Sequence, residues 1–248
     1  MRWTWLYNFL YTKGLRSPRA QTACNTGDSD GRPTFDRTGG SQGELSSMSD
    51  TGKPASQAEP VITSSSSRHS STLLKATSIE GYRQFVADIS KGELRSQVIL
   101  NRTPEHAAIV LAALFSHAQK FVHIVSRKMS TDIYGLSEVI QAAVQFLKTH
   151  PEGMIHMLVE EAVDPNTHPL LSALNQEAPE RVKLEQIPPL VRNTFKFNFA
   201  VADGQSYRFE VDREVREATI RFRDHEFGGD LEAAFQHILA LSHAHPAK

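Results

Sequence analysis

Lys196 and Asn198 are the polar residues of a short alternating stretch that ends in the pair Asp203-Gly204. Phenylalanines stand on either side of them, so a β-strand over residues 195–201 would place both polar side chains on one face. A protonated lysine attracts a phosphate or a carboxylate, and an amide beside it adds a neutral donor. Two interpretations stay open: a non-catalytic anion site centred on Lys196, or the solvent side of an amphipathic strand.

Charged residues also follow two predicted strands. Arg127 and Lys128 come directly after the first, and Glu160 and Glu161 come after the next. Ligands of open α/β sheets collect at the carboxyl ends of strands, so Arg127 and Lys128 are candidate contacts for an anion. The two glutamates either bind a cation or pair with basic residues as surface ion pairs.

The eleven histidines show no spacing typical of a metal site or of a nucleophile with its base. His225-Glu226 lacks the second histidine of a zinc-binding His-Glu-x-x-His helix, because position 229 is a glycine. His123 and His156 lie within apolar strands, where paired residues of the sheet are the ordinary case. A glycine-rich phosphate loop and a Gly-x-Ser-x-Gly elbow are also absent from the sequence, so we predict no cofactor, no metal and no catalytic residue.

The elements that must position these residues alternate along the second part of the chain. Apolar periodicity predicts helices near 79–91, 104–119, 135–148 and 169–176, and a last helix that begins at Gly228. It predicts strands at 97–100, 121–125, 154–159, 181–186, 195–201, 207–211 and 218–222, with Asp203-Gly204 as a hairpin turn. This order predicts an α/β domain with a single mixed sheet flanked by helices.

The composition divides the chain in two. Residues 27–72 hold few large apolar side chains and a run of serines, so we predict a disordered low-complexity tail over residues 1–77, within which Met48 is an alternative start. The predicted domain spans 78–248. The single cysteine, Cys24, cannot form an internal disulfide, which is compatible with a reducing compartment. The sequence has no apolar run of the roughly 18–20 residues that cross a bilayer, so we expect a cytoplasmic protein without a membrane contact.

The charge balance bears on possible partners. The whole chain carries 27 basic and 28 acidic residues, whereas the part from Glu80 to Lys248 carries 18 and 22. A domain with a net negative charge disfavours binding to nucleic acid, although a local basic face is not excluded.

The order of elements and the run Lys196-Phe197-Asn198-Phe199-Ala200-Val201-Ala202-Asp203-Gly204 together resemble one half of the phospholipase D superfamily. The motif of that family reads His-x-Lys, four residues, Asp, commonly followed by Gly, and here the spacing and the Asp-Gly match. The resemblance covers roughly residues 121–243. In the family, two such halves face each other across one active site. The resemblance therefore implies a homodimer, or pairing with another protein, through the sheet edge near the motif strand.

The two residues that carry the chemistry of that family are replaced. The family's histidine attacks phosphorus and its lysine stabilises the phosphate oxygens. Lys196 stands in place of the histidine, and a protonated amine has no lone pair with which to attack. Asn198 stands in place of the lysine and offers only a neutral dipole. The resemblance thus implies a degenerate motif and a pseudoenzyme.

We therefore predict a non-catalytic binding, sensing or scaffold domain that associates with itself or with an unidentified protein partner. Its degenerate motif positions are Lys196, Asn198, Asp203 and Gly204. The alternative is a phosphodiesterase or nuclease that uses residues outside the motif, such as His123, His156 or Glu160.

Overall fold

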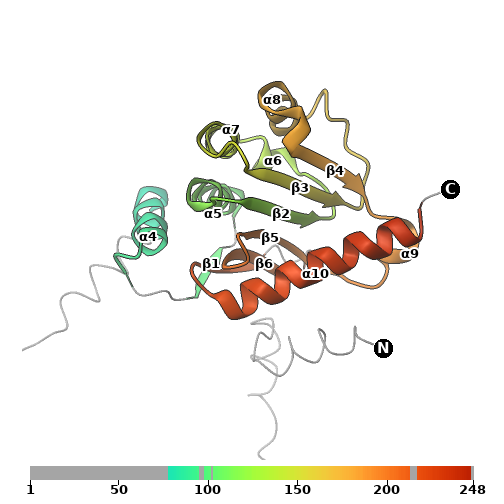
Figure 1. Cartoon of the computed structure of the whole chain (residues 1–248). Coiled ribbons are helices and arrows are strands. Elements are labelled where there is room, and N and C mark those ends of the chain that lie inside the picture. Colours follow the sequence, from blue (N-terminus) through green and yellow to red (C-terminus); the bar gives the residue numbers. More distant parts are fainter. Residues whose placement is uncertain (1–77, 95–97, 102, 213–216, 247–248) are drawn as a thin grey trace, which may run out of the picture. The chain divides into compact units, whose positions relative to one another are not determined.

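The computed structural model describes residues 78–94, 98–101, 103–212 and 217–246; the predicted tail at 1–77 lies outside them. The described strands form one seven-stranded sheet in the order β1-β7-β6-β5-β2-β3-β4 (Figure 1). They are β1 (Ile99–Asn101), β2 (Phe121–Ser126), β3 (Met154–Val159), β4 (Val182–Gln186), β5 (Asn198–Ala202), β6 (Ser206–Asp212) and β7 (Glu217–Arg221). The predicted α/β class with a single mixed sheet is confirmed.

The sheet has a parallel half and an antiparallel half. Strands β2, β3 and β4 run parallel, and β5, β6, β7 and β1 are each antiparallel to their neighbours. The motif strand β5 lies in the middle, hydrogen-bonded to β2 on one side and to β6 on the other. Because both of its backbone edges are occupied, β5 is not itself an edge through which the sheet could associate. The edge strands of the described sheet are β1 and β4.

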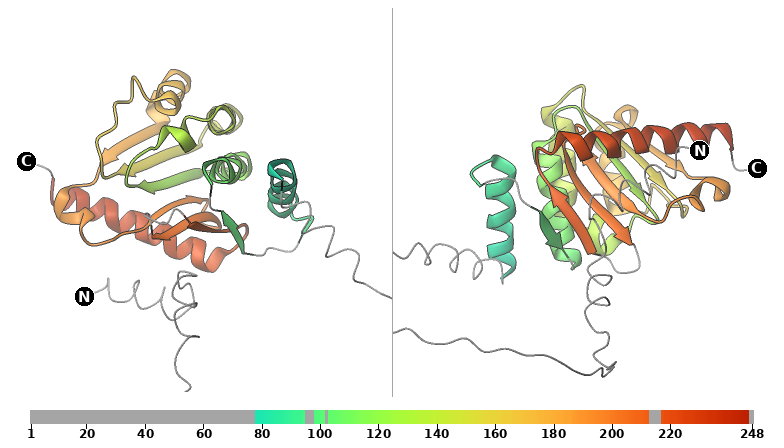
Figure 2. Two further views of the ribbon diagram at one scale, coloured as in Figure 1. Left: turned by 180° about the vertical axis from the view of Figure 1, so that it is seen from behind. Right: turned by 90° about the horizontal axis from the view of Figure 1, so that it is seen from below.

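Helices cover both faces of the sheet (Figures 1 and 2). Helices α5, α7 and α8 pack on one face, which we call the α5 face, and the long α10 crosses the other, the α10 face. The described helices are α4 (Ile79–Lys91), α5 (Pro104–His117), α6 (Thr131–Tyr134), α7 (Ser137–Thr149), α8 (Pro169–Glu177), α9 (Pro189–Arg192) and α10 (His225–Ala244), with a 3-10 turn at Pro179–Arg181.

Local signals place the first two helices where the sequence predicts them. The Ser78 hydroxyl accepts a hydrogen bond from the Gly81 amide at 3.0 Å, and α4 ends at Gly92, whose φ of 91° suits a glycine. The Thr103 hydroxyl likewise caps α5 by accepting from the His106 amide at 3.2 Å. These caps satisfy amides that a helix start leaves unpaired.

Helix α10 begins earlier than the sequence predicts. It starts at His225 behind an Asp224 cap, and Gly228 lies in its first turns instead of opening it. A Cβ on Gly228 would meet the carbonyl oxygen of Gly204 at 2.6 Å. Because Gly228 has no side chain, α10 can lie in close contact with the turn that joins β5 to β6.

Strand β5 is shorter than predicted and is buried on both faces. It starts at Asn198, so Lys196 precedes the strand. Phe199 and Val201 lie on the α10 face, while Ala200 and Ala202 are only 2% and 3% exposed beneath α5. A helix layer covers this side of the strand at the two alanines, whereas Lys196 is exposed and Asn198 is half-buried.

Asp203 and Gly204 form the predicted hairpin turn. Their φ angles are 52° and 63°, and the Gln205 amide donates to the Ala202 carbonyl at 3.1 Å across the turn. Positive φ at both central positions matches the right-handed twist of the two strands, and aspartate and glycine tolerate it better than most residues.

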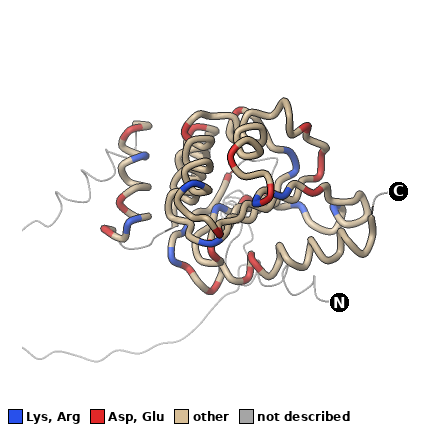
Figure 3. Tube along the Cα trace, turned by 45° about the horizontal axis from the view of Figure 1, so that its top comes forward, with Lys and Arg blue, Asp and Glu red and all other residues tan. Residues whose placement is uncertain are grey.

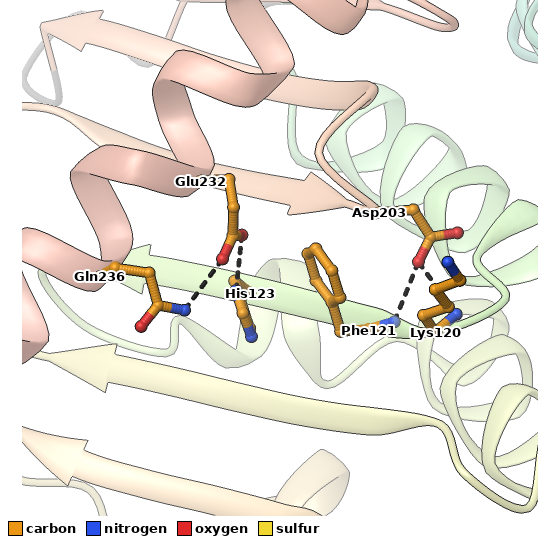
Figure 4. Close-up of polar contacts among 6 residues, drawn as sticks. All are labelled: Lys120, Phe121, His123, Asp203, Glu232 and Gln236. Atoms are coloured by element: carbon orange, nitrogen blue, oxygen red, sulfur yellow. Dashed lines mark hydrogen bonds and ion pairs between the residues drawn. The ribbon is translucent and has the colours of Figure 1, made fainter.

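The Asp203 carboxylate also holds the junction between α5 and β2. It accepts hydrogen bonds from three successive backbone amides, those of Gln119 at 2.8 Å, Lys120 at 2.9 Å and Phe121 at 2.9 Å. Figure 4 shows the carboxylate beside Lys120 and Phe121. The residue that matches the motif aspartate thus has a structural role that its own contacts explain.

We expect Asp203→Ala to lower the free energy of unfolding by about 2–4 kcal/mol, because three amides lose a charged acceptor and alanine fits a positive φ poorly. Asp203→Asn retains one acceptor oxygen and the tolerance for this φ, so its loss should be smaller. Urea unfolding measures both. The exposed Glu152→Ala serves as the control and should change stability by less than about 0.5 kcal/mol. Equal changes in the free energy of unfolding for Asp203→Ala and Glu152→Ala would contradict the structural role of the Asp203 carboxylate.

Candidate functional site

A polar hollow of about 490 Å³ lies at the carboxyl ends of β2 and β3. Its walls come from the loops after these two strands, from α9 with the residues that follow it, and from the end of β6. The lining residues are Arg127, Glu160, Glu161, Arg192, Asn193, Lys196 and Asp212. Arg127 and the two glutamates that follow the neighbouring strand thus line the same hollow.

The hollow combines three cations with three carboxylates. The Arg127 Nε donates to the Glu161 Oε1 at 2.9 Å, but each side chain is 48% exposed, so the pair contributes little to stability. The side chains of Arg192 and Lys196 have no hydrogen bond or ion pair with any residue in the described part of the chain. Two cations without a partner among the described residues thus border one hollow.

The two polar motif residues have different surroundings. Lys196 is exposed and lines the hollow. Asn198 is half-buried, and its amide is bound at both ends: Oδ1 accepts from the Arg127 backbone amide at 2.9 Å, and Nδ2 donates to the Glu210 Oε2 at 2.6 Å. Asn198 therefore holds the start of the Arg127 loop, and only Lys196 of the pair is available to a ligand.

The other predicted positions lie elsewhere. Asp203 and Gly204 form the turn at the opposite end of β5. Lys128 is exposed, and its carbonyl accepts from the Ser126 hydroxyl at 2.7 Å, but its side chain is not among the described residues that line the hollow. Of the six predicted site residues, the structure brings only Lys196 and Arg127 together in the hollow.

Arg192, Asn193 and Asp212 are lining residues that sequence reasoning missed. The pair Pro188-Pro189 begins the short helix α9, which carries Arg192 to the ends of the parallel strands. Two adjacent prolines signal a turn in the sequence, but not the direction in which the chain continues. Asp212 lies just after an irregularity in the register between β6 and β7, which strand alternation does not reveal.

His123, a candidate of the enzyme alternative, is buried on the α10 face, away from the hollow. Its Nδ1 lies 2.7 Å from the Glu232 Oε2 of α10 (Figure 4). Its ring stacks on Phe121 and on Phe235, with centroid distances of 4.4 and 4.1 Å. Glu232 also accepts from the Gln236 amide at 2.9 Å. These contacts fix the imidazole between sheet and helix.

His156 has a similar environment on the neighbouring strand. Its Nε2 lies 2.8 Å from the Glu185 Oε1, and the other oxygen of Glu185 lies 2.6 Å from His243 Nε2 on α10. Burial lowers the pKa of His156 despite the hydrogen bond to Glu185. Burial raises the pKa of Glu185, but the hydrogen bonds from His243 and His156 outweigh it and hold that pKa below its ordinary value.

The three residues of the enzyme alternative do not converge. His123 and His156 contact glutamates beneath α10, whereas Glu160 lines the hollow. Within the described residues, no group of three or more His, Cys, Asp or Glu side chains is placed to hold a metal ion. None of the described helices has the length and apolarity needed to cross a membrane.

Acidification should destabilise the fold partly through His156. Its folded-state pKa lies below the ordinary value of 6.5, so the unfolded chain takes up the proton more readily. This contribution is intact above about pH 6.5 and declines as the pH falls from there toward the lowered pKa. His156→Gln removes the titrating group and should flatten the decline of unfolding free energy across this window, as measured by urea unfolding. The exposed His225→Gln should retain the wild-type slope. If the unfolding free energy of His156→Gln depends on pH as it does in the wild type, His156 does not contribute to the destabilisation by acid.

Comparisons with solved structures give matches of low identity. The first is the archaeal chromatin protein TrmBL2, with a TM-score of 0.43 and 10% identity over 70% of this chain and 64% of that chain. The second is Nuc from Salmonella typhimurium, a phospholipase D family member, with a TM-score of 0.43 and 11% identity over 59% of this chain and 95% of that chain. The third is a phosphatidylserine synthase from Haemophilus influenzae Rd KW20, with a TM-score of 0.40 and 8% identity over 61% of this chain and 39% of that chain. The chain thus spans less than two thirds of the first and third proteins.

Comparisons of the sequence alone give one match, to a family model. No curated protein matches the chain. One family model, described as "Domain of unknown function (DUF7931)", matches residues 103–247, from the cap of α5 to the end of the described part. Because this match spans more than half of the sequence, the chain belongs to the DUF7931 family.

Proposed function

We propose that this domain binds an anionic ligand of the phosphate or carboxylate class in the polar hollow and does not turn it over. One observation carries the proposal: Lys196 and Arg192 border the same hollow, and neither side chain has a partner in the described part of the chain. Cations near a concave surface attract anions, and an arginine can bind two oxygens at once.

The residue types in the hollow support binding without cleavage. The described lining contains no histidine, cysteine or serine that would serve as a nucleophile. Lys196 stands where the resembling family has its attacking histidine. The amide of Asn198, at the position of the family's lysine, is already bound to Arg127 and Glu210.

The carboxylates of the hollow limit the kind of anion that fits. Glu160, Glu161 and Asp212 balance the cations, so a highly charged polymer would meet repulsion as well as attraction. Figure 3 shows acidic and basic residues interspersed along the described chain. A small ligand that carries an anionic group together with hydroxyl or amine donors for the carboxylates suits this lining better than a nucleic-acid backbone.

We expect Lys196→Gln and Arg192→Gln each to weaken the binding of inorganic phosphate about fivefold or more, because a charge-assisted hydrogen bond contributes roughly 1–2 kcal/mol. Isothermal titration at low ionic strength measures this affinity. Lys120→Gln is the matched control, since its exposed side chain lies at the opposite end of β2 and should leave binding unchanged.

A turnover assay separates this proposal from the enzyme alternative. An aryl phosphodiester and single-stranded DNA should both remain intact, with and without divalent metal. Hydrolysis that is lost in His156→Ala but retained in Lys196→Ala would contradict the proposal and favour an enzyme.

We also propose that the chain self-associates. The support is the resemblance to a family in which two halves build one site. Because β5 is paired on both sides, association has to use another surface. Light scattering at tens of micromolar should give at least twice the mass of one chain, and a strict monomer would refute this part.

A further inference from the structure

Besides the Nδ1 of His168, which lies just before α8, three side chains of the described structure carry buried polar atoms that no protein group satisfies. These atoms are the Tyr82 hydroxyl, both polar atoms of the Asn101 amide and the Nε of Arg208. The three residues are 4%, 1% and 5% exposed. Buried polar groups are nearly always hydrogen-bonded, so several such atoms in one region point to an occupant other than protein.

The strand register places Asn101 and Arg208 on the same face of the sheet. Ile99 of β1 pairs with Ile220 of β7, which pairs in turn with Arg208 of β6. Residues opposite one another in antiparallel strands share a face, and Asn101 lies two residues beyond Ile99 on that same side. Ile99 and Ile220 belong to the core beneath the helices, so this is the α5 face.

Tyr82 reaches the same region from α4. Helix α4 packs against α5 and buries Tyr82, and this burial raises the pKa of its hydroxyl while the charge of Arg208 opposes the increase. The Tyr82 ring stacks on His106 with a centroid distance of 3.9 Å. His106 itself lies in the first turn of α5, where its amide is bound to Thr103. The phenol is therefore held in place.

The acceptors close to Arg208 are already used. Its Nη2 donates to the Glu210 Oε1 at 2.5 Å, and the other Glu210 oxygen accepts from Asn198 at 2.6 Å. The unsatisfied atoms are the donors Nε of Arg208 and Nδ2 of Asn101, the Tyr82 hydroxyl, which can donate or accept, and the acceptor Oδ1 of Asn101, so donated hydrogens outnumber acceptor atoms. An excess of buried donors beside a guanidinium calls for a group rich in oxygen acceptors.

We propose that Tyr82, Asn101 and Arg208 form a second, buried site that binds a small oxyanion, such as a phosphate or a carboxylate group. The site uses none of the residues that line the polar hollow. Glu210 balances the charge of Arg208. The ligand would contact the Arg208 Nε together with the Tyr82 hydroxyl and the Asn101 amide. An ordered water is the competing occupant, and the experiment separates the two.

The test uses the full chain with Lys196→Gln and Arg192→Gln combined as the reference, so that the hollow contributes little. Sodium phosphate and sodium acetate are titrated separately at constant ionic strength, by calorimetry and by thermal unfolding. We expect at least one of them to bind and to raise the Tm. Adding Tyr82→Phe removes only the hydroxyl, and the affinity should fall about fivefold or more. Without ligand, the Tm of this variant should be unchanged or higher, because an unsatisfied buried atom is removed.

Tyr207→Phe is the matched control. The Tyr207 hydroxyl donates to the Asp224 Oδ2 at 2.9 Å, so its loss should lower the Tm and leave the anion affinity unchanged. If the reference binds neither anion, the buried atoms contact water only and the proposal fails. Equal affinities with and without Tyr82→Phe overturn it as well. Binding in the wild type that disappears in the combined Lys196→Gln and Arg192→Gln reference assigns the anion to the hollow instead.

Discussion

Helices cover the sheet on both faces, and this constraint decides where polar side chains lie. A polar group that faces a helix layer has lost water, so it needs a partner within the protein. On the α10 face, His123 pairs with Glu232 and His156 with Glu185. On the α5 face, Asn198 pairs with Glu210. The carboxyl ends of β2 and β3 are free of this constraint, and there charged residues gather around a hollow that solvent reaches.

The same constraint explains why the motif-like residues behave differently from one another. Lys196 precedes β5 and stays exposed, whereas Asn198 enters the sheet and becomes a hydrogen-bonding partner of the interior. Arg208 already shares Glu210 with Asn198, so the positive charge of this interior lies on β6 rather than on the motif strand. A second cation beneath the helices would need a further carboxylate, because an unpaired buried charge is costly. An asparagine at position 198 satisfies the same carboxylate without adding a charge.

Much of the fold could be predicted because its signals are local. The caps at Ser78 and Thr103 and the turn at Asp203-Gly204 are short patterns with a direct physical cause. The burial of Ala200 could not be predicted, since alternation of large and small residues looks the same beneath a helix layer as beside solvent. The candidate site was likewise predictable only in part. Ligands of open α/β sheets collect at the carboxyl ends of strands, and this rule places Arg127 near the glutamates. The positions of Arg192 and Asp212 depend on the paths of α9 and of the irregular end of β6, which the sequence pattern does not show.

The hollow and the buried Arg208 are joined by one run of hydrogen bonds. The Arg127 amide donates to Asn198, Asn198 donates to Glu210, and Arg208 donates to the other oxygen of Glu210. An anion on Arg208 competes with Glu210 for the guanidinium, which leaves more of the carboxylate charge to attract the Asn198 amide. That amide sets the position of the loop that carries Arg127 into the hollow. Since coupling free energies are reciprocal, an anion held in the hollow by Arg127 would in turn change the affinity at Arg208 by the same factor. Of the three residues with unsatisfied atoms, Arg208 is thus part of the polar network that shapes the hollow, although it lies beneath the helices.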